Sequence, residues 1–387
     1  MIFPVKIKYS LFYLLLFIFA STSLRAQFEG LKFGSDSTLE VISWNIEHFP
    51  KEDQTTIDFV SDLMISIDAD IFAIQEVTSE DDLVLLVSKM DGWDYAYAYN
   101  QYAALAYVYN TDSIKDVNFF EIYTSKSREF PRSPFVMEFT FMAQPFVIIN
   151  NHLKCCGDNE MDMNDNWDEE KRRFDACILL DEYIETYYDD SKVILTGDLN
   201  DVLIDDFDDN VFEIFIQNDL NYLVADMEIA EGDETNWSYP SWPSHIDHII
   251  ITNEFFEDYN KPESETITIK PDEYFEEGFN EYDDLVSDHR PVGIKLKTES
   301  YVSIDEFYVA MPSIYPNPVN RNAEVWLSDI AMYTEISIYD IKGKLINKIN
   351  NNKERIHFNT SVLNKGIYLI KFENSHGDTT VSRFIVK

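Results

Sequence analysis

The chain has 387 residues, of which 30 are basic and 71 are acidic, so its formal net charge at pH 7 is −41. Residues 27–312 hold 17 of the basic and 64 of the acidic residues, a net charge of −47, whereas residues 313–387 hold ten basic and seven acidic residues. Such an acidic first part opposes nonspecific binding to nucleic acid or anionic lipid, because both attract proteins through Lys and Arg. A phosphate-bearing ligand would have to be attracted locally, through a metal cation.

Residues 1–26 have the pattern of an export signal. Lys6 and Lys8 precede the apolar run LFYLLLFIFA, and the small residues of SLRA precede Gln27. The apolar run is shorter than the about 20 residues that span a bilayer comfortably. We therefore predict a cleaved signal peptide, with a retained anchor as the alternative. No later stretch is apolar enough to cross a membrane, so we expect no stable membrane insertion.

Helical and strand-like patterns alternate through residues 27–300, and some strand-like runs follow one another directly. Runs rich in β-branched and aromatic residues predict strands at 39–46, 70–77, 104–110, 135–141, 146–152, 192–198, 245–251 and 292–297. Apolar residues at helical spacing predict helices at 55–68, 81–90 and about 167–187. This order predicts mixed sheets covered by helices, and hence an α/β layered domain over residues 27–300.

The stretch SIYPNPVN at 313–320 contains two prolines and separates the acidic part from a tail of different composition. We place a linker at 301–312 and a separate domain at 313–387. Within that domain, EISIYDIKGKLI and GIYLIKFEN alternate apolar and polar residues around glycine-containing turns. This alternation predicts a small all-β sandwich.

Three cysteines occur, at positions 155, 156 and 177. An exported protein can hold a disulfide, so one of the adjacent pair could bond to Cys177. Small buried thiols are an equally good interpretation. The absence of a C-x-x-C spacing disfavours a zinc site.

Several predicted strands begin or end at side chains that bind metal or phosphate. These are Asn45, Glu47, Glu76, His152, Asp198, Asn200, Asp247, Asp288 and His289. Ligand sites of layered α/β folds lie at strand ends, whereas each residue taken alone could equally serve a turn or a helix cap. In GDLND, residues two apart in an extended chain face the same way, so Asp198 and Asn200 can point into one cleft.

The segments SWNIE, IQEV, FPRSPF, NNHL, TGDLND, SHIDHI and SDHRPV occur in this order between residues 43 and 292. The set resembles the endonuclease/exonuclease/phosphatase superfamily, which includes pancreatic-type deoxyribonucleases, abasic-site endonucleases, neutral sphingomyelinases and inositol polyphosphate phosphatases. The resemblance implies a four-layer α-β-β-α sandwich followed by the small β sandwich. It also implies that SDHRPV is a catalytic motif rather than a turn.

The resemblance implies a divalent-metal site. Glu76 resembles the principal metal ligand, and Asn45 the neighbour that orients phosphate and metal. Glu47 matches a ligand of some members only, and Asp288 resembles a further ligand paired with the last histidine. Oxygen ligands suit Mg²⁺ or Mn²⁺, with Ca²⁺ as a further candidate.

The resemblance also implies a set of catalytic residues. Asp198 resembles the group that activates water, and Asn200 the amide that steadies it. Asp247 resembles the carboxylate that orients His289, and His152 a phosphate-contacting or acidic group. Arg132 resembles an arginine that supports the site. The expected reaction is one-step, in-line hydrolysis of a phosphate ester, with Asp198 as base and either histidine as acid.

For the substrate, the first hypothesis is nucleic acid, DNA or RNA, cleaved outside the cell by a monomer. A phospholipid or inositol phosphate is the alternative, although His248 stands where the inositol phosphatase motif has Arg, and a non-enzymatic adhesin is the third. Cations at the start of the helix near 167 could contact a nucleic-acid backbone or could simply be solvated. These cations are Lys154, Lys171, Arg172 and Arg173.

Residues 313–387 resemble the C-terminal sorting domain of the type IX secretion system of Bacteroidetes-type bacteria, through YPNP, LNKGIYLIKF and the terminal RFIVK. This resemblance implies contact with the type IX machinery, export through the periplasm and outer membrane, and release or attachment at the cell surface. A carbohydrate-binding sandwich is the alternative.

Overall fold

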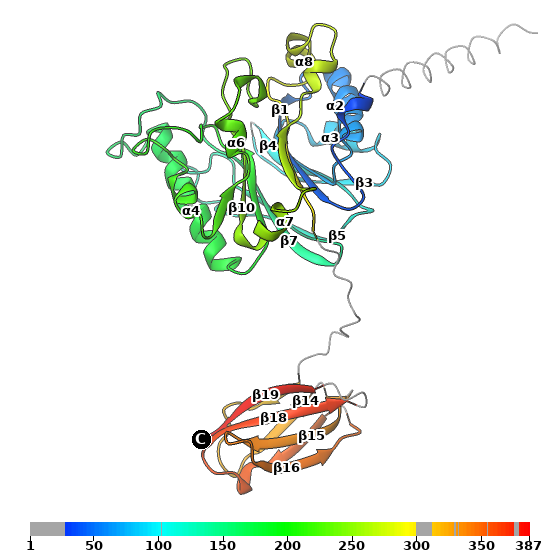
Figure 1. Cartoon of the computed structure of the whole chain (residues 1–387), viewed down its shortest axis with the longest axis vertical. Coiled ribbons are helices and arrows are strands. Elements are labelled where there is room, and N and C mark those ends of the chain that lie inside the picture. The colour runs from blue at the N-terminus through cyan, green and yellow to red at the C-terminus, as the bar shows by residue number, and fades with distance from the viewer. Residues whose placement is uncertain are drawn as a thin grey trace, which may run out of the picture. The chain divides into compact units, whose positions relative to one another are not determined.

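The computed structural model describes residues 28–298 apart from 102, and residues 312–387 apart from 329, 332, 354 and 375–378. The predicted signal peptide and almost all of the predicted linker therefore lie outside the described residues. The chain divides into two compact units between residues 301 and 302. Each unit has its own sheets (Figure 1). Each also has its own hydrophobic core.

The first unit contains two six-stranded sheets. The first sheet has the order β11-β12-β1-β2-β4-β3. Its strands are β1 (Leu39–Phe49), β2 (Ile71–Val77), β3 (Trp93–Ala98), β4 (Ala104–Asn110), β11 (Glu265–Thr268) and β12 (Val292–Leu296). The second sheet has the order β5-β6-β7-β8-β10-β9. Its strands are β5 (Ile114–Glu121), β6 (Phe135–Phe141), β7 (Gln144–His152), β8 (Val193–Asp198), β9 (Tyr222–Val224) and β10 (Asp247–Thr252).

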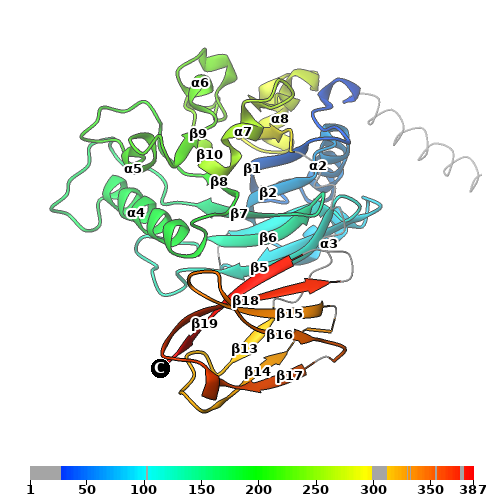
Figure 2. The ribbon, with the colours of Figure 1, turned by 60° about the horizontal axis from the view of Figure 1, so that its bottom comes forward.

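Helices cover the outer faces of the two sheets. The α-helices are α2 (Asp53–Ile67), α3 (Glu80–Val87), α4 (Glu169–Tyr187), α5 (Glu213–Ile216), α6 (Met227–Ala230), α7 (Phe256–Tyr259) and α8 (Phe279–Leu285). Single 3₁₀ turns are η1 (Glu29–Leu31), η2 (Glu234–Asn236), η3 (Asn253–Phe255) and η4 (Pro271–Tyr274). Figures 1 and 2 show α2 and α4 on opposite sides of the paired sheets.

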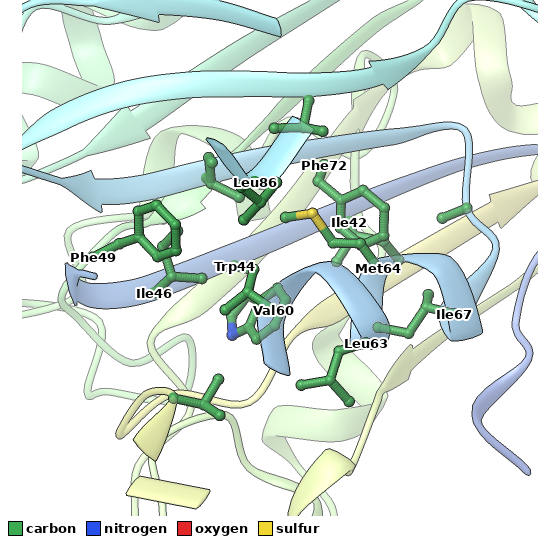
Figure 3. Close-up of a cluster of buried hydrophobic side chains, with 14 of the residues drawn as sticks. Ile42, Trp44, Ile46, Phe49, Val60, Leu63, Met64, Ile67, Phe72 and Leu86 are labelled. Atoms are coloured by element: carbon green, nitrogen blue, oxygen red, sulfur yellow. The ribbon is translucent and has the colours of Figure 1, made fainter. Parts of the chain in front are cut away.

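Three hydrophobic clusters fill the spaces between these layers. One lies between α2, α3 and the first sheet, where Val60, Leu63 and Met64 of the buried α2 face meet Trp44 and Phe72 (Figure 3). A second cluster joins the inner faces of the two sheets. The third packs α4 against the second sheet. The predicted four-layer α-β-β-α arrangement is confirmed.

Local signals explain the helix boundaries. Asp168 caps α4 by accepting a hydrogen bond from Lys171 N, and Glu169 and Glu170 supply negative charge in the first turn. Ser79 caps α3 through the amide of Asp82 in the same way. The outer strands β3, β5, β9 and β11 were not predicted from the sequence. Those strands are short or carry exposed polar residues, so their alternation is weak.

The second unit is an all-antiparallel β structure of two sheets, as predicted. Its sheets have the orders β13-β14-β17 and β16-β15-β18-β19. Their strands are β13 (Ser313–Tyr315), β14 (Glu324–Ser328), β15 (Tyr333–Asp340), β16 (Leu345–Asn350), β17 (Arg355–Asn359), β18 (Gly366–Asn374) and β19 (Thr379–Val386), with the 3₁₀ turn η5 (Thr360–Val362). The inward-facing apolar residues of both sheets form a fourth cluster.

Candidate active site

Sheet register brings most of the predicted site residues to one edge. In the second sheet, β7 and β8 are parallel and end together, with His152 opposite Asp198. Strand β10 is antiparallel to β8, so its first residue, Asp247, also lies opposite Asp198. In the first sheet, Asn45 lies where the regular pairing of β1 with β2 stops, and Glu76 is the last residue but one of β2. Five side chains from distant parts of the chain therefore meet where these strands end or begin.

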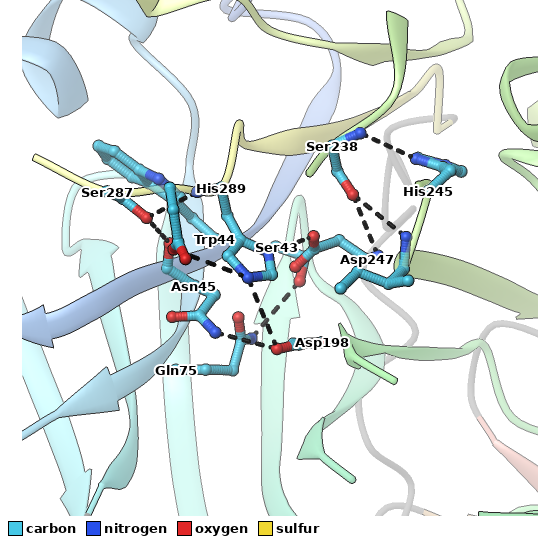
Figure 4. Close-up of polar contacts among 12 residues, drawn as sticks. Ser43, Trp44, Asn45, Gln75, Asp198, Ser238, His245, Asp247, Ser287 and His289 are labelled. Atoms are coloured by element: carbon cyan, nitrogen blue, oxygen red, sulfur yellow. Dashed lines mark hydrogen bonds and ion pairs between the residues drawn. The ribbon is translucent and has the colours of Figure 1, made fainter. Parts of the chain in front are cut away.

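The Asn45 amide links the two sheets across this edge. Asn45 Nδ2 lies 2.9 Å from Asp198 Oδ2 in the second sheet (Figure 4). The same Nδ2 lies 3.2 Å from Glu76 Oε1 in the first sheet. Asn45 Oδ1 accepts the backbone N–H of Glu47 at 3.0 Å. In this orientation Asn45 donates to two carboxylates and holds them side by side.

Glu76 has an unusual backbone conformation. Its φ is +64°, in the left-handed region that non-glycine residues seldom adopt, and the register of β2 shifts on both sides around it. Its carboxylate faces His48, whose backbone N lies 3.2 Å and Nδ1 3.0 Å from Glu76 Oε2. Strained residues of this kind cluster at functional sites. The irregularity turns Glu76 out of the strand and toward the site.

His289 is held by Asp247 at the centre of the site. His289 Nδ1 lies 2.7 Å from Asp247 Oδ2, and both side chains are buried. Burial opposes the imidazolium, but the carboxylates of Asp247, Asp198 and Asp288 outweigh it and raise the pKa of His289 to about 10. His289 Nε2 lies 4.0 Å from Asp198 Oδ2 and 3.9 Å from Asp288 Oδ1. A charged imidazole thus sits between two acids.

His152 differs electrostatically from His289. Its Nε2 lies 3.4 Å from Asp198 Oδ2 and 3.8 Å from Glu76 Oε1. Burial, assisted by the positive charges of Arg132, His289 and His48, lowers the pKa of His152 well below its usual value. His152 is therefore neutral at neutral pH. Of the two histidines that the sequence offers as candidate acids, His289 is the one whose pKa is raised.

Asp198 is in contact with groups from both sheets. Burial is the main cause that raises the pKa of Asp198 to about 7. Its Oδ1 accepts the backbone N–H of Asn200 at 3.1 Å. Asn200 has φ +57°, and its Nδ2 lies 3.4 Å from Leu153 O, so its side chain supports the end of β7. A carboxyl with a pKa near 7 can accept a proton at neutral pH.

Glu76 and Asp288 offer carboxylate oxygens, the ligand type that a hard divalent cation prefers. Asp288 Oδ1 is buried and has no hydrogen-bond partner among the described residues, and burial raises the pKa of Asp288 to about 6. An orphaned buried carboxylate oxygen beside other acids is what an absent cation would leave. Glu47 is instead paired with Lys51, which also binds Asp283 at 2.9 Å.

Arg132 lies in the segment before β6 and is half-buried. Its charge acts on His152, since it is the second cause of the lowered pKa of that imidazole. Arg132 therefore belongs to the electrostatic surroundings of the site.

The hypothesis of a basic surface at the start of α4 is wrong for two of its four members. Arg173 is 2% exposed and pairs with Glu170 at 3.2 Å and Asp201 at 2.8 Å. Arg172 is 9% exposed and donates to Arg128 O. Both arginine side chains are therefore buried and bind groups within the fold, and they are not available on the surface. Lys171 pairs with Asp175 at 2.6 Å.

A compact group of Asp226, His245 and His248 lies behind the site and resembles a metal-binding set. Its hydrogen bonds argue otherwise. His245 Nδ1 lies 3.3 Å from the donating backbone N of Ser238, so the proton is on Nε2, which faces Asp226 Oδ2 at 2.9 Å. His248 binds Asp226 Oδ2 through Nδ1 at 2.7 Å and Asp201 O through Nε2 at 2.8 Å. A neutral His245 has no lone pair left for a metal.

Residues with no recognisable sequence signal hold the site together. Ser287 Oγ donates to Asn45 O at 2.7 Å and accepts from His289 N at 3.0 Å. Ser238 Oγ accepts from the backbone N of Ile246 and Asp247, at 3.3 and 3.2 Å, and Ser238 O accepts from Arg290 N at 2.7 Å. Buried serines are common, so only the folded chain reveals these roles.

The first unit also matches a known protein family. Residues 42–289 match the Endonuclease/Exonuclease/phosphatase family. The chain belongs to this family. Family members are metal-dependent hydrolases of phosphate esters, and the first unit is therefore such an enzyme. We refer to it as the phosphoesterase unit.

Residues 313–387 match the secretion system C-terminal sorting domain. The type IX resemblance of the tail is confirmed, and it implies export to the cell surface or the medium. Within the described parts of the chain, no helix is both long and apolar enough to cross a membrane. Comparison with curated proteins gives no matching sequence.

Solved structures share the fold of the phosphoesterase unit at low sequence identity. D. rerio TDP2 complexed with single strand DNA product has a TM-score of 0.51 and 13% identity, covering 68% of this chain and 100% of that chain. A humanized D. rerio TDP2 gives 0.50 and 13% over the same shares. A Bacteroides thetaiotaomicron mannosyl-6-phosphatase gives 0.48 and 18%, covering 67% and 99%. The two TDP2 likenesses show a common fold.

Proposed function

We propose that the phosphoesterase unit hydrolyses phosphodiester bonds of nucleic acids outside the cell. The main support for this proposal is the set of short contacts that join Asn45, Glu76 and Asp198 across the two sheets. The charged His289 lies next to them. A phosphodiester resists attack by an anion, so hydrolysis needs neutralised charge and a positioned water. The site has a charged imidazole and carboxylates that can bind a cation, which neutralise charge, and it has a carboxyl group that can position and deprotonate water.

We assign the roles as follows. Glu76 and Asp288 hold a divalent ion, Mg²⁺ or Mn²⁺, which when bound neutralises charge on the phosphate. Asp198 accepts the proton of the attacking water, because its raised pKa suits a base near neutral pH. His289 donates one hydrogen bond, from Nε2, to the phosphate as charge builds, and Asp247 at Nδ1 keeps the imidazole protonated. Neutral His152 contacts a phosphate oxygen.

Two observations bear on the substrate in opposite directions. The TDP2 fold is known with a single strand DNA product, which supports a nucleic-acid substrate. The net charge of −41 and the internal use of Arg172 and Arg173 favour instead a small phosphate ester, which needs few cations around it. A phospholipid or an inositol phosphate is therefore the second candidate.

A substrate panel separates the candidates. Purified enzyme with Mg²⁺ is tested on supercoiled plasmid, RNA, sphingomyelin, inositol phosphates and a sugar phosphate, each repeated with EDTA. Plasmid nicking that EDTA abolishes is the expected result. Release of phosphocholine or free phosphate without any nicking would replace the first candidate by the second. Hydrolysis that survives EDTA would contradict the metal assignment.

We further propose that the tail directs passage through the outer membrane by the type IX machinery. Its acidic and basic residues are nearly balanced, in contrast to the phosphoesterase unit. A chain lacking residues 313–387 should accumulate in the periplasm as folded, active enzyme. Unchanged amounts of enzyme in the medium or at the cell surface would contradict this role.

A further inference from the structure

Two adjacent cysteines lie shortly after the end of β7, the strand that carries His152. Cys155 and Cys156 lie three and four residues beyond His152, and both are exposed. Their sulfur atoms are 3.0 Å apart, with Cys156 Sγ donating to Cys155 Sγ. Cys177, in contrast, is 1% exposed and packs in the cluster between α4 and the second sheet. Among the cysteines of the described residues, the thiols of Cys155 and Cys156 are therefore accessible to solvent and the thiol of Cys177 is not.

Buried groups hold the backbone of this pair in place. Arg173 Nη1 donates to Lys154 O at 2.8 Å and to Cys156 O at 2.7 Å, one carbonyl on each side of Cys155. Arg173 is itself fixed by its ion pairs with Glu170 and Asp201. The exposed side chains of Cys155 and Cys156 therefore lie on a segment whose backbone is fixed by the buried Arg173.

The local backbone conformation is unusual for these residues. Cys156 has φ +69°, in the left-handed region. The next residue, Gly157, has φ +128°, and a Cβ there would lie 1.9 Å from Glu170 Oε1. A turn that costs conformational energy persists only where its surroundings enforce it. Here the enforced turn brings two sulfur atoms side by side.

We propose that Cys155 and Cys156 are a redox site that closes into a disulfide between neighbouring residues. The oxidant is a disulfide of the glutathione class. The Cys155 thiolate attacks one of its sulfurs and releases one thiolate, and Cys156 then attacks the mixed disulfide and releases the second. The two cysteines lose two electrons and two protons, and the external disulfide becomes two thiols.

The position of the pair makes this bond reversible. Adjacent Cα atoms are about 3.8 Å apart across a trans peptide, below the usual disulfide range of about 4.4–6.8 Å. Strained and exposed disulfides are reduced more easily than structural ones. Lys154 Nζ lies 3.8 Å from Cys155 Sγ, which places a positive charge beside the attacking sulfur.

Mass spectrometry of the full chain tests this proposal, because trypsin separates the thiols. Cleavage after Lys154, Lys171 and Arg173 puts Cys155 and Cys156 in peptide 155–171 and Cys177 in peptide 174–192. The protein is equilibrated with glutathione disulfide, denatured in iodoacetamide and digested. Peptide 155–171 should be lighter than the dithiol by two hydrogens, with alkylation at least about tenfold below that of a sample reduced first.

Cys177→Ser is the matched control and should leave the closed ring of peptide 155–171 unchanged. Cys155→Ser should leave Cys156 free for alkylation or for a mixed disulfide with glutathione. Double alkylation of peptide 155–171 in the oxidised wild-type sample would overturn the proposal. So would a bond that joins peptides 155–171 and 174–192.

Discussion

Asp247 and His289 form a hydrogen-bonded pair of 2.7 Å across the two sheets of the phosphoesterase unit. Asp247 begins β10 in the second sheet, and His289 lies three residues before β12 in the first. Asn45 and Asp198 make a second link of the same kind at 2.9 Å. The proposed catalytic groups thus depend on how the sheets pack, and the inner hydrophobic cluster sets that packing.

Asp247→Asn should reduce turnover strongly while leaving the fold intact. The amide cannot stabilise the His289 imidazolium, so the pKa of His289 should fall and the proposed donor should be lost. Loss of a positioned acid or base lowers rates by roughly 10²–10⁴-fold. The measurement is hydrolysis of a small diester, with circular dichroism to monitor the fold. Exposed Asp219→Asn is the control, and a D247N rate within twofold of it, about 0.4 kcal/mol, would contradict the role.

Glu76→Gln should weaken metal binding. The substitution keeps the size of the side chain and its contact with Asn45 but removes the charge that attracts a cation. We expect the Mg²⁺ concentration for half-maximal rate to rise at least about tenfold. Mn²⁺ binding followed by electron paramagnetic resonance gives a readout independent of activity. Equal Mn²⁺ affinity in E76Q and in the exposed control Glu276→Gln would remove Glu76 from the ligand set.

Ser238→Ala should impair both stability and turnover. Two backbone N–H groups at the start of β10 lose their acceptor, at a cost of about 1–3 kcal/mol. Asp247 then loses its fixed position, so kcat should fall more than KM rises. Denaturant unfolding and steady-state kinetics measure the two effects. Ser61→Ala, a buried serine on α2, should lower stability without changing kcat; equal kcat in S238A would contradict the positioning role.

Glu40→Gln should stabilise the fold increasingly as pH rises. Burial raises the pKa of Glu40 from 4.5 to about 9, so the folded chain keeps a proton that the unfolded chain releases. The free energy of unfolding of the wild type should therefore decline between these pH values, by up to about 1.4 kcal/mol per pH unit. E40Q lacks this decline and should gain on the wild type from pH 5 to pH 9.

Urea unfolding of wild type, E40Q and the exposed control Glu121→Gln at several pH values measures this difference. The E40Q advantage should be small near pH 5 and largest near pH 9, and E121Q should follow the wild type. A constant difference at all pH values would show that Glu40 is charged in the folded protein.

The alternation of helical and strand-like patterns predicted mixed sheets covered by helices, and the family resemblance implied the four layers. Polar residues at strand ends pointed to one edge as the site, because ligand sites of layered α/β folds lie at strand ends. The pairing that sets Asp198 opposite His152 and Asp247 was not predicted, and the folded chain reveals it. The conformation of Glu76 could not be predicted, since no local signal marks a left-handed residue at the end of a strand. Its contacts with His48 follow from that irregularity.

The burial of Arg172 and Arg173 could not be predicted from the sequence either. A basic run at the start of an acidic helix looks solvated, but Asp201 lies 28 positions later and reaches Arg173 only in the folded chain. Ser238 and Ser287 were equally hidden, because a serine shows its role through the distant backbone groups it binds. Long-range hydrogen bonds, rather than periodicity, decide these parts of the site.

The four hydrophobic clusters divide cleanly between the two units. The first three contain residues 28–296 only, and the fourth contains residues 314–386 only. A protease that cuts between residues 298 and 312 would leave every apolar side chain of these clusters with its own neighbours. Such a cut would therefore separate the sorting domain from the phosphoesterase unit without any refolding of either unit.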